Sequence, residues 1–230
     1  MWDATYGFGG NGPYVEVPPG TPFFNIPGRT GGGCVLDGPF KDMVVNMGPG
    51  PDTNGNPRCL TRDFSPYVAA SWSGVNMTNL SMKQKDFGWF NRISNGLSNI
   101  NDLGIHGGGH FSVGGVLGTM GDMWNSPSGE LWQNLTHPCH LSACSDPVFY
   151  LHHANLDRLW WSWQKMDLSR RLTDISGPIN YADFNNIQGG NVTLDFPIGI
   201  GVNAPNVTVR DVMDIGAGVL CYDYDQVYKY

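Results

Sequence analysis

The amino-acid sequence predicts a mainly α-helical domain with long loops rich in glycine and proline and a few short β-strands. Apolar side chains recur at every third or fourth position between residues 146 and 168, which is typical of one face of a buried helix. The 32 glycines and 16 prolines are scattered rather than gathered into a repeat, which indicates a loop-rich globular chain. No linker divides the sequence, so we treat residues 1–230 as a single domain.

The first part of the chain differs in composition from the middle part. Residues 1–66 are dense in Gly, Pro and Asn, and we expect no long helix there. Residues 81–102 place Phe87, Phe90 and Ile93 at helical spacing. This spacing predicts a helix that ends in a turn.

The segment from residue 146 to 168 predicts the longest helix. Asp146 suits the N-cap and Pro147 the first helical position. One face of this helix carries Phe149, His153, Leu156, Trp160 and Trp163. From residue 191, alternation in "NVTLDFPIGIGV" and then in "VLCYDYDQVYKY" predicts short strands that close over the core.

Charge and hydropathy narrow the class of partner. Charged residues make up 14% of the chain, the net charge is -7, and no cluster of Lys and Arg occurs. This composition argues against nucleic acid or an anionic membrane as partner and favours a small neutral substrate. No apolar run approaches the roughly 20 residues that cross a bilayer. Neither a signal peptide nor an anchor is visible.

Two features nevertheless predict a secreted glycoprotein. Glycosylation sequons occur at Asn76, Asn79, Asn134, Asn191 and Asn206. Five cysteines lie mostly in loop-like stretches, at Cys34, Cys59, Cys139, Cys144 and Cys221. The odd count leaves at least one thiol without a partner inside this chain.

The first candidate site is "GIHGGGHFSVGG". His106 and His110 are four residues apart, so on a helix they lie on one face and their imidazoles converge on one ion. The three glycines between them each cost about 1 kcal/mol against Ala in a helix. A metal bond would offset that cost. The alternative is two loop histidines in a glycine-rich turn.

A second segment, "DPVFYLHHANLDRLWWSWQ", supplies another histidine. His152 and His153 fall on different helical faces, so at most one of them readily joins the first pair. His153 shares the apolar face and is expected to point inward. A histidine on such a face is more often a satisfied core residue than a ligand. Three imidazoles suit Cu, Zn, Fe or Ni, and the set alone does not choose among them.

Taken together, "HGGGHFSVGG", "MGDMWNSP" and "DPVFYLHHANLDRLWWSWQ" resemble the second copper-binding half of the tyrosinase, catechol oxidase and haemocyanin family. "YGFGGNG", "CVLDGPF", "RCLTRDF", "VRDVMDI" and "LCYDYD" resemble other parts of a fungal-type member. The resemblance covers nearly all of the chain. It implies part of a four-helix-bundle type-3 copper domain, which holds two coppers by three histidines each.

The same resemblance implies the reaction. A complete domain oxidises o-diphenols, and in some members monophenols, to o-quinones with dioxygen. Phenolic or catecholic small molecules are therefore the expected substrates.

Residue by residue, the resemblance assigns the second copper to His106, His110 and His153. Phe149 would pack over the site and hold the ligand rings. Met123 corresponds to a position near the entrance that restricts substrate, with plain core filler as the alternative.

Further residues are expected to hold the structure rather than to touch copper. Asp157 and Arg158 would anchor the helix through ion pairing. Tyr222 and Tyr224 form the Tyr-x-Tyr pattern of the closing segment.

The chain departs from the family pattern most clearly in its histidine count. It has 6 histidines and none precedes His106, so the first copper site is expected to be missing. We therefore expect at most one copper in this chain. A fragment or shortened gene model fits best, and a separate polypeptide carrying the first half is the alternative.

Two smaller departures concern access and proton transfer. Residues 128–145 form an insertion with His137, Cys139 and His140, which suggests an extra loop, a translated intron or, less well, a zinc site. After the first histidine, tyrosinases commonly carry an Asn that helps a Glu position a water. Here Gly107 occupies that position, and Asp102 is the nearby carboxylate. This favours diphenols over monophenols.

Three functional hypotheses fit these residues. The first is a type-3 copper oxidoreductase represented by its C-terminal part. The second is a non-catalytic, secreted metal-binding relic. A mononuclear copper or zinc protein is the third and weakest.

Overall fold

The computed structural model describes residues 1–19, 25–48, 55–96, 101–124, 143–180, 183, 185–202 and 204–230. The main helices are α1 (Pro66–Trp72), α2 (Val75–Met82), α3 (Phe87–Asn95), α4 (Gly104–Gly114) and α5 (Val148–Lys165). The short elements are α6 (Leu168–Arg171), α7 (Val209–Val212), two 3-10 turns (Thr119–Trp124 and Ala143–Ser145) and the strands β1 (Val44–Val45), β2 (Arg58–Cys59), β3 (Pro197–Ile198) and β4 (Val207–Thr208). The strands form two antiparallel pairs, β1 with β2 and β3 with β4. The predicted mainly α fold is confirmed.

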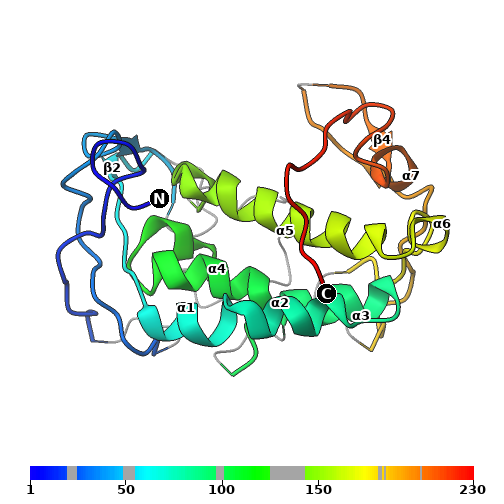
Figure 1. Cartoon of the computed structure of the whole chain (residues 1–230). Helices are drawn as coiled ribbons and strands as arrows, with labels where there is room; N and C mark the ends of the chain where they lie inside the picture. Colours follow the sequence, from blue (N-terminus) through cyan, green and yellow to red (C-terminus); the bar gives the residue numbers. More distant parts are fainter. Residues whose placement is uncertain are drawn as a thin grey trace.

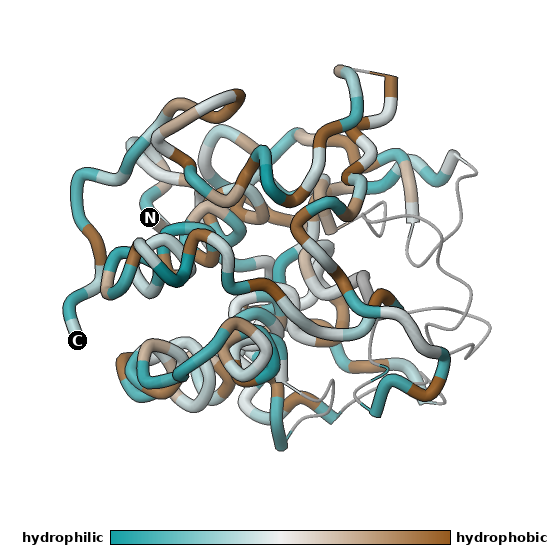
Figure 2. Tube along the Cα trace, turned by 90° about the vertical axis from the view of Figure 1, so that its right-hand side faces the viewer, coloured by the Kyte–Doolittle hydropathy of each residue, from teal (hydrophilic) through white to brown (hydrophobic). Residues whose placement is uncertain are grey.

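The helices pack around shared apolar clusters. Figure 1 shows α1, α2 and α3 in succession along one side of the molecule, with α4 beside them and α5 across α4. Four of these helices, α2 to α5, contribute to one cluster, which comprises Met77, Met82, Phe90, Ile105, Leu159 and Trp163. Figure 2 shows hydrophobic and hydrophilic positions alternating along the helices, as expected when one side of each is buried.

Helix boundaries depend on local capping. Ser65 caps α1 by accepting from the Val68 N–H at 3.2 Å, and Pro66 takes the first position. The sequence pattern predicts one helix over residues 81–102. The structure instead ends α2 at Met82 and starts α3 after Asp86, whose carboxylate accepts from the Trp89 N–H at 2.9 Å. The prediction overlooked Asp86, which caps a new helix in the middle of a continuous apolar pattern.

The longest helix begins two residues after the predicted N-cap. α5 starts at Val148 with Pro147 at the cap position. Asp146 still accepts from the Val148 N–H at 3.1 Å, but its main partner is Arg62. Boundary shifts of this size are common, and here the carboxylate serves the helix start and a buried ion pair together.

The prediction of short strands from residue 191 onward is only partly correct. β3 and β4 do form within the segment predicted to contain strands. Residues 219–230 contain no strand. This segment, red in Figure 1, crosses α5 and ends beside α2 and α3. Tyr228 packs against the central cluster and donates from its hydroxyl to Asn155 at 2.7 Å.

A buried ion pair connects the N-terminal loops to α5. Arg62 donates to the Asp146 carboxylate from Nε at 2.9 Å and from Nη2 at 3.0 Å, and both side chains are 0% exposed. Its Nη1 also donates to the carbonyl oxygens of Phe8, Gly9 and Gly10. One guanidinium therefore joins three parts of the chain.

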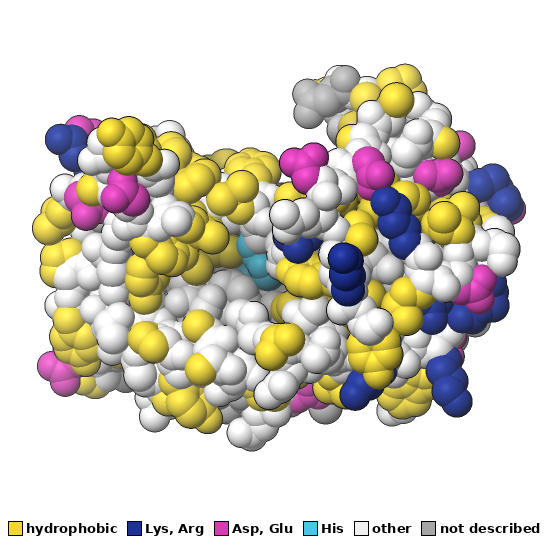
Figure 3. Space-filling model, in the orientation of Figure 1, with side chains coloured by type: hydrophobic (Ala, Val, Ile, Leu, Met, Phe, Trp, Pro, Cys, Tyr) yellow, Lys and Arg dark blue, Asp and Glu magenta, His cyan; other side chains and the backbone are white. Residues whose placement is uncertain are grey.

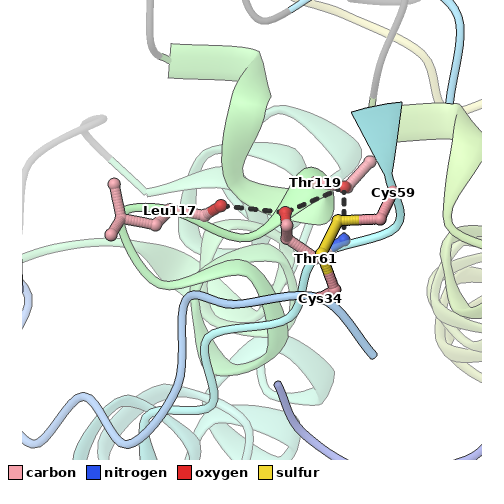
Figure 4. Close-up of a disulfide and its surroundings, with 5 residues drawn as sticks. All are labelled: Cys34, Cys59, Thr61, Leu117 and Thr119. Carbon is pink, nitrogen blue, oxygen red and sulfur yellow. Dashed lines mark hydrogen bonds between the residues drawn. A yellow bond between two sulfur atoms is a disulfide. The ribbon is translucent and has the colours of Figure 1, made fainter. Parts of the chain in front are cut away.

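Covalent and hydrogen-bonded links hold the same region, as Figure 4 shows. Cys34 and Cys59 form a disulfide. Next to it, Thr61 donates from its hydroxyl to the Leu117 carbonyl at 2.9 Å, and its N–H donates to the Thr119 hydroxyl at 3.1 Å. The segment with β2 is thereby tied to the loop after α4.

Two further cysteines differ in their bonding, as expected from an odd number of cysteines. Cys144 is disulfide-bonded, and Cys221 is a free, exposed thiol. In the described part of the chain, no helix combines the length and apolarity that a membrane span requires.

We expect Arg62→Met to lower the free energy of unfolding by about 3–5 kcal/mol, because it leaves the buried Asp146 carboxylate without its charge partner. Urea denaturation of the purified chain measures this change.

Arg210→Met is the matched control, since its pair with Asp195 is 56% and 78% exposed. Exposed pairs contribute at most about 1 kcal/mol. Equal losses in the two variants would contradict the importance of the buried pair.

Candidate metal centre

Four histidines from α4 and α5 meet in the interior. Each offers a ring nitrogen, and these four atoms lie within 4.8 Å of one another; the residues are His106, His110, His152 and His153. Histidine side chains are visible at the bottom of a hollow in the face shown in Figure 3. The two segments singled out in the sequence are thus brought together.

Three ring nitrogens form the tightest part of the cluster. The Nε2 atom of His110 lies 3.2 Å from Nε2 of His106 and 3.3 Å from Nε2 of His153. Nitrogen ligands at about 2.0–2.1 Å from a tetrahedral metal ion stand about 3.3 Å apart. The spacing of these atoms therefore suits a single ion.

The tautomer of His110 is set by its second nitrogen. Nδ1 lies 3.1 Å from the main-chain oxygen of Met120. A carbonyl oxygen only accepts, so Nδ1 carries the hydrogen in the neutral ring and Nε2 keeps its lone pair. That lone pair faces the other two Nε2 atoms.

His152 lies in the cluster but is oriented differently. Its Nε2 lies 2.9 Å from the main-chain oxygen of His106, so this nitrogen donates to a carbonyl. The helical pattern places His152 and His153 on different faces and predicts that at most one joins the pair. The structure instead brings both rings into the cluster. The His152 ring reaches back over α4, with its centroid 4.9 Å from that of His110.

Burial keeps the cluster uncharged. Desolvation, and then the neighbouring His153, lower the pKa of His106 to about 4. Desolvation also lowers the pKa of His152 to about 3 and that of His110 well below its usual value. The pKa of His153 is lowered by burial as well. Neutral imidazoles at physiological pH are the form that binds metal ions.

The glycines of α4 allow close approach of its neighbours. A Cβ on Gly108 would lie 2.6 Å from the Cβ of Trp72 in α1. A Cβ on Gly109 would lie 2.0 Å from Cε1 of His152. Glycine is a poor helix former, but a larger residue at either position would displace α1 or the His152 ring.

Two cavities border the cluster. One of about 470 Å³ is lined by His152, Leu151 and Gly109 among others. The other, of about 310 Å³, is lined by His106, His153 and aromatic side chains of α3 and α5. The histidines thus form a wall that both cavities reach.

Comparison with known proteins decides the family. Residues 2–166 match the model described as the common central domain of tyrosinase. The chain belongs to the tyrosinase family. A match over this range includes both histidine segments.

Several tyrosinase-family proteins resemble the chain in sequence. A tyrosinase-like protein of Diaporthe leptostromiformis is 30% identical over 98% of this chain and 52% of its own length. Tyrosinase P of Aspergillus terreus is 31% identical over 86% of this chain and 53% of its own length. An N-acetyl-6-hydroxytryptophan oxidase of Emericella nidulans is 31% identical over 86% of this chain and 54% of its own length. The chain therefore spans about half the length of these relatives.

A solved structure agrees with the sequence comparisons. The polyphenol oxidase of Thermothelomyces thermophila, in its G292N variant, superposes with a TM-score of 0.74 at 28% identity. The match covers 96% of this chain and 60% of that one. The fungal tyrosinase-type fold expected from the motifs is thereby confirmed.

The predicted packing residue lies against the tyrosinase-type cluster. The ring centroid of Phe149 is 4.1 Å from that of His153 and 5.7 Å from that of His110. It contacts two of the three predicted ligands.

The predicted anchors of α5 use different partners from those expected. Asp157 accepts hydrogen bonds from the hydroxyls of Tyr222 at 2.7 Å and Tyr224 at 2.6 Å. Arg158 lies over the ring of Tyr228 at 4.3 Å. Tyrosines of the terminal segment thus take the place of the ion pairing that the sequence suggested. Burial, and then Asp157, raise the pKa of both Tyr222 and Tyr224.

The structure describes only some of the other residues predicted for the site. Met123 lies in the 3-10 turn Thr119–Trp124, and its side chain is outside the described residues, as is most of the insertion 128–145. Gly107 is buried, with a Cβ position 3.3 Å from that of Leu103. Asp102 pairs with Arg92 at 3.1 Å.

Sequence reasoning missed two neighbours of the cluster. The main-chain oxygen of Met120 orients His110, and a main-chain acceptor leaves no signal in the sequence. Asn95 contacts Nδ1 of His106 at 2.7 Å. This contact between α3 and α4 is tertiary, so the residue identities alone do not indicate it.

We expect Gly109→Ala to destabilise the chain by about 1–3 kcal/mol, because the new methyl group overlaps the His152 ring. Gly107→Ala is the control: the three atoms nearest to its methyl group all belong to Leu103, at 3.3 Å or more, and we expect a change within about 1 kcal/mol. Thermal unfolding of both variants tests this, and equal effects would show that His152 does not pack on Gly109.

We expect the metal-free chain to lose stability as the pH falls from 6.5 towards 4. The unfolded chain takes up a proton on His106 near pH 6.5, whereas the folded chain does so only near pH 4. Stability is lost across that window by about 1.4 kcal/mol per pH unit for each such histidine. Urea unfolding at a series of pH values measures the slope, which should be shallower in His106→Gln. An unchanged slope would contradict a buried, neutral His106.

Proposed function

We propose that the chain is the part of a copper-dependent oxidoreductase that carries its second copper site. The complete protein would oxidise o-diphenols to o-quinones with dioxygen. Family membership supports copper chemistry on phenols, and the relatives include a tyrosinase, a polyphenol oxidase and an oxidase of a hydroxylated tryptophan.

One observation carries the metal assignment. The Nε2 lone pair of His110 faces the Nε2 atoms of His106 and His153 at 3.2 and 3.3 Å inside a buried cluster. Their lowered pKa values make a shared proton unfavourable near neutral pH. A cation with affinity for imidazole relieves this arrangement, and Cu(II) ranks highest among divalent first-row metals for such a donor set.

The residues have distinct tasks in this proposal. His106, His110 and His153 would hold copper, and Phe149 would fix the rings of His110 and His153 while excluding water. Copper, when bound, supplies the change of oxidation state that moves electrons from a diphenol to dioxygen. Two diphenols give up four electrons and four protons, which convert one dioxygen to two waters.

The same geometry favours diphenols over monophenols. A monophenol must lose its proton to a nearby base before it reacts. Gly107 offers no side chain to position a water, and Asp102 is engaged by Arg92 at 3.1 Å. Diphenols, which are more acidic and more easily oxidised, depend less on such a base.

A partner segment completes the site in this proposal. Four of the 6 histidines belong to one cluster, and His137 and His140 lie outside the described residues. A further set of histidines would come from a missing or separate N-terminal half. The chain spans about half the length of its relatives.

A secreted, non-catalytic metal-binding relic is the second candidate. The single described histidine cluster favours it. The Cys34–Cys59 disulfide supports secretion, since disulfides persist in oxidising compartments. Asn76, Asn191 and Asn206 are exposed, as glycosylation requires.

We expect the purified chain to bind one copper and to show no steady oxygen uptake with 4-tert-butylcatechol. His153→Ala should abolish this binding, because it removes one of the three converging ring nitrogens. His152→Ala should keep one copper per chain, since its Nε2 donates to the main chain.

Metal analysis and an oxygen electrode give the result. Two coppers per chain, or sustained catechol oxidation, would contradict the half-site proposal. Loss of copper in His152→Ala with retention in His153→Ala would reverse the ligand assignment.

A further inference from the structure

Two asparagines on α3 form a hydrogen-bonded chain that ends on His106. Asn95 Nδ2 donates to the main-chain oxygen of Asn91 at 3.0 Å and to its side-chain Oδ1 at 2.6 Å. Asn95 Oδ1 lies 2.7 Å from Nδ1 of His106. Asn91 is exposed, whereas Asn95 and His106 are half-buried.

The main-chain oxygen of Asn91 decides which way the Asn95 amide points. A carbonyl oxygen only accepts, so the Asn95 atom facing it must be the NH₂ group. The oxygen of the same amide then faces His106. An amide oxygen also only accepts, so Nδ1 of His106 must carry a hydrogen.

This assigns the tautomer of the neutral His106 ring. With the hydrogen on Nδ1, the lone pair is on Nε2, which lies 3.2 Å from Nε2 of His110. Without the Asn95 acceptor, His106 would place its hydrogen on Nε2 and donate it to His110. That alternative would close the cluster against a metal ion.

We propose that the Asn91–Asn95 pair positions His106 for metal binding, with Asn95 fixing the ring's tautomer and direction and Asn91 fixing the Asn95 amide. The metal part of this inference rests on the proposed function. Asn95 is a positioning residue, because its oxygen contacts the far nitrogen of the ring. Acceptors of this kind orient metal-ligating histidines and raise their basicity.

Other contacts already join α3 to α4. Phe90 and Ile105 belong to the same buried cluster, and Arg92 pairs with Asp102. Loss of the Asn95 hydrogen bond therefore affects the ring more than the helix packing.

The test compares Asn95→Leu, Asn95→Asp and Asn91→Ala, with Asn76→Leu on an exposed position of α2 as control. Nitrogen-15 NMR of the metal-free chain reports the tautomer of His106, and Cu(II) titration reports affinity. Asn95→Leu should move the hydrogen from Nδ1 towards Nε2 and weaken Cu(II) binding about 10–100-fold. Asn95→Asp keeps an acceptor, so it should keep the Nδ1–H tautomer and bind within a few-fold of the unmodified chain.

Asn91→Ala removes the Oδ1 acceptor but keeps the main-chain oxygen that sets the direction of the Asn95 amide, so folding and the Nδ1–H tautomer should both be preserved. An unchanged tautomer and affinity in Asn95→Leu would overturn the inference, and a mixed tautomer in Asn91→Ala would contradict the role given to the main-chain oxygen. Failure of the unmodified chain to bind Cu(II) would count against the proposed function instead. The NMR comparison would still decide the role of the asparagines in that case.

Discussion

A buried charge pair, Arg62 with Asp146, sets where α5 begins, and the positions of the histidines on α5 depend on that point. The Asp146 carboxylate meets the guanidinium and the Val148 N–H together, so the helix is held at its first residue. His152 and His153 lie within the next two turns of a rigid helix. An apolar pair of equal volume can match the stability of a buried ion pair. We infer that the contribution of this pair lies in the precise placement of the helix.

The cluster concentrates neutral imidazoles, three of which contact an amide or main-chain oxygen with one ring nitrogen. Burial lowers the pKa of His106 and His110, and a main-chain oxygen and an amide oxygen hold their outer nitrogens. The inner nitrogens are therefore left with lone pairs that repel each other. The fold sustains this through helix packing and glycines that admit close neighbours, and a bound cation would convert the repulsion into attraction.

Much of the fold could be predicted from the sequence, because helical periodicity is a local signal. The meeting of the two histidine segments is not local, and it was expected from the family resemblance of the motifs. The break at Asp86 was missed, since a cap interrupts an apolar pattern without changing it. The helical-face argument predicted that at most one of His152 and His153 would join the first pair, but ring nitrogens of both lie in the cluster. That prediction ignored the reach of an imidazole over a glycine. Main-chain acceptors such as Met120 O depend on tertiary structure and leave no trace in residue identities.

The terminal segment has a consequence for the order of events during synthesis. The hydroxyls of Tyr222 and Tyr224 reach Asp157, one turn beyond His153, across 65 and 67 residues of sequence. A chain emerging from the ribosome carries both histidine segments long before these tyrosines exist. The outer side of α5 is completed only by residues that are translated well after both histidine segments. Capture of a metal ion in its final geometry therefore follows the synthesis of this terminal segment.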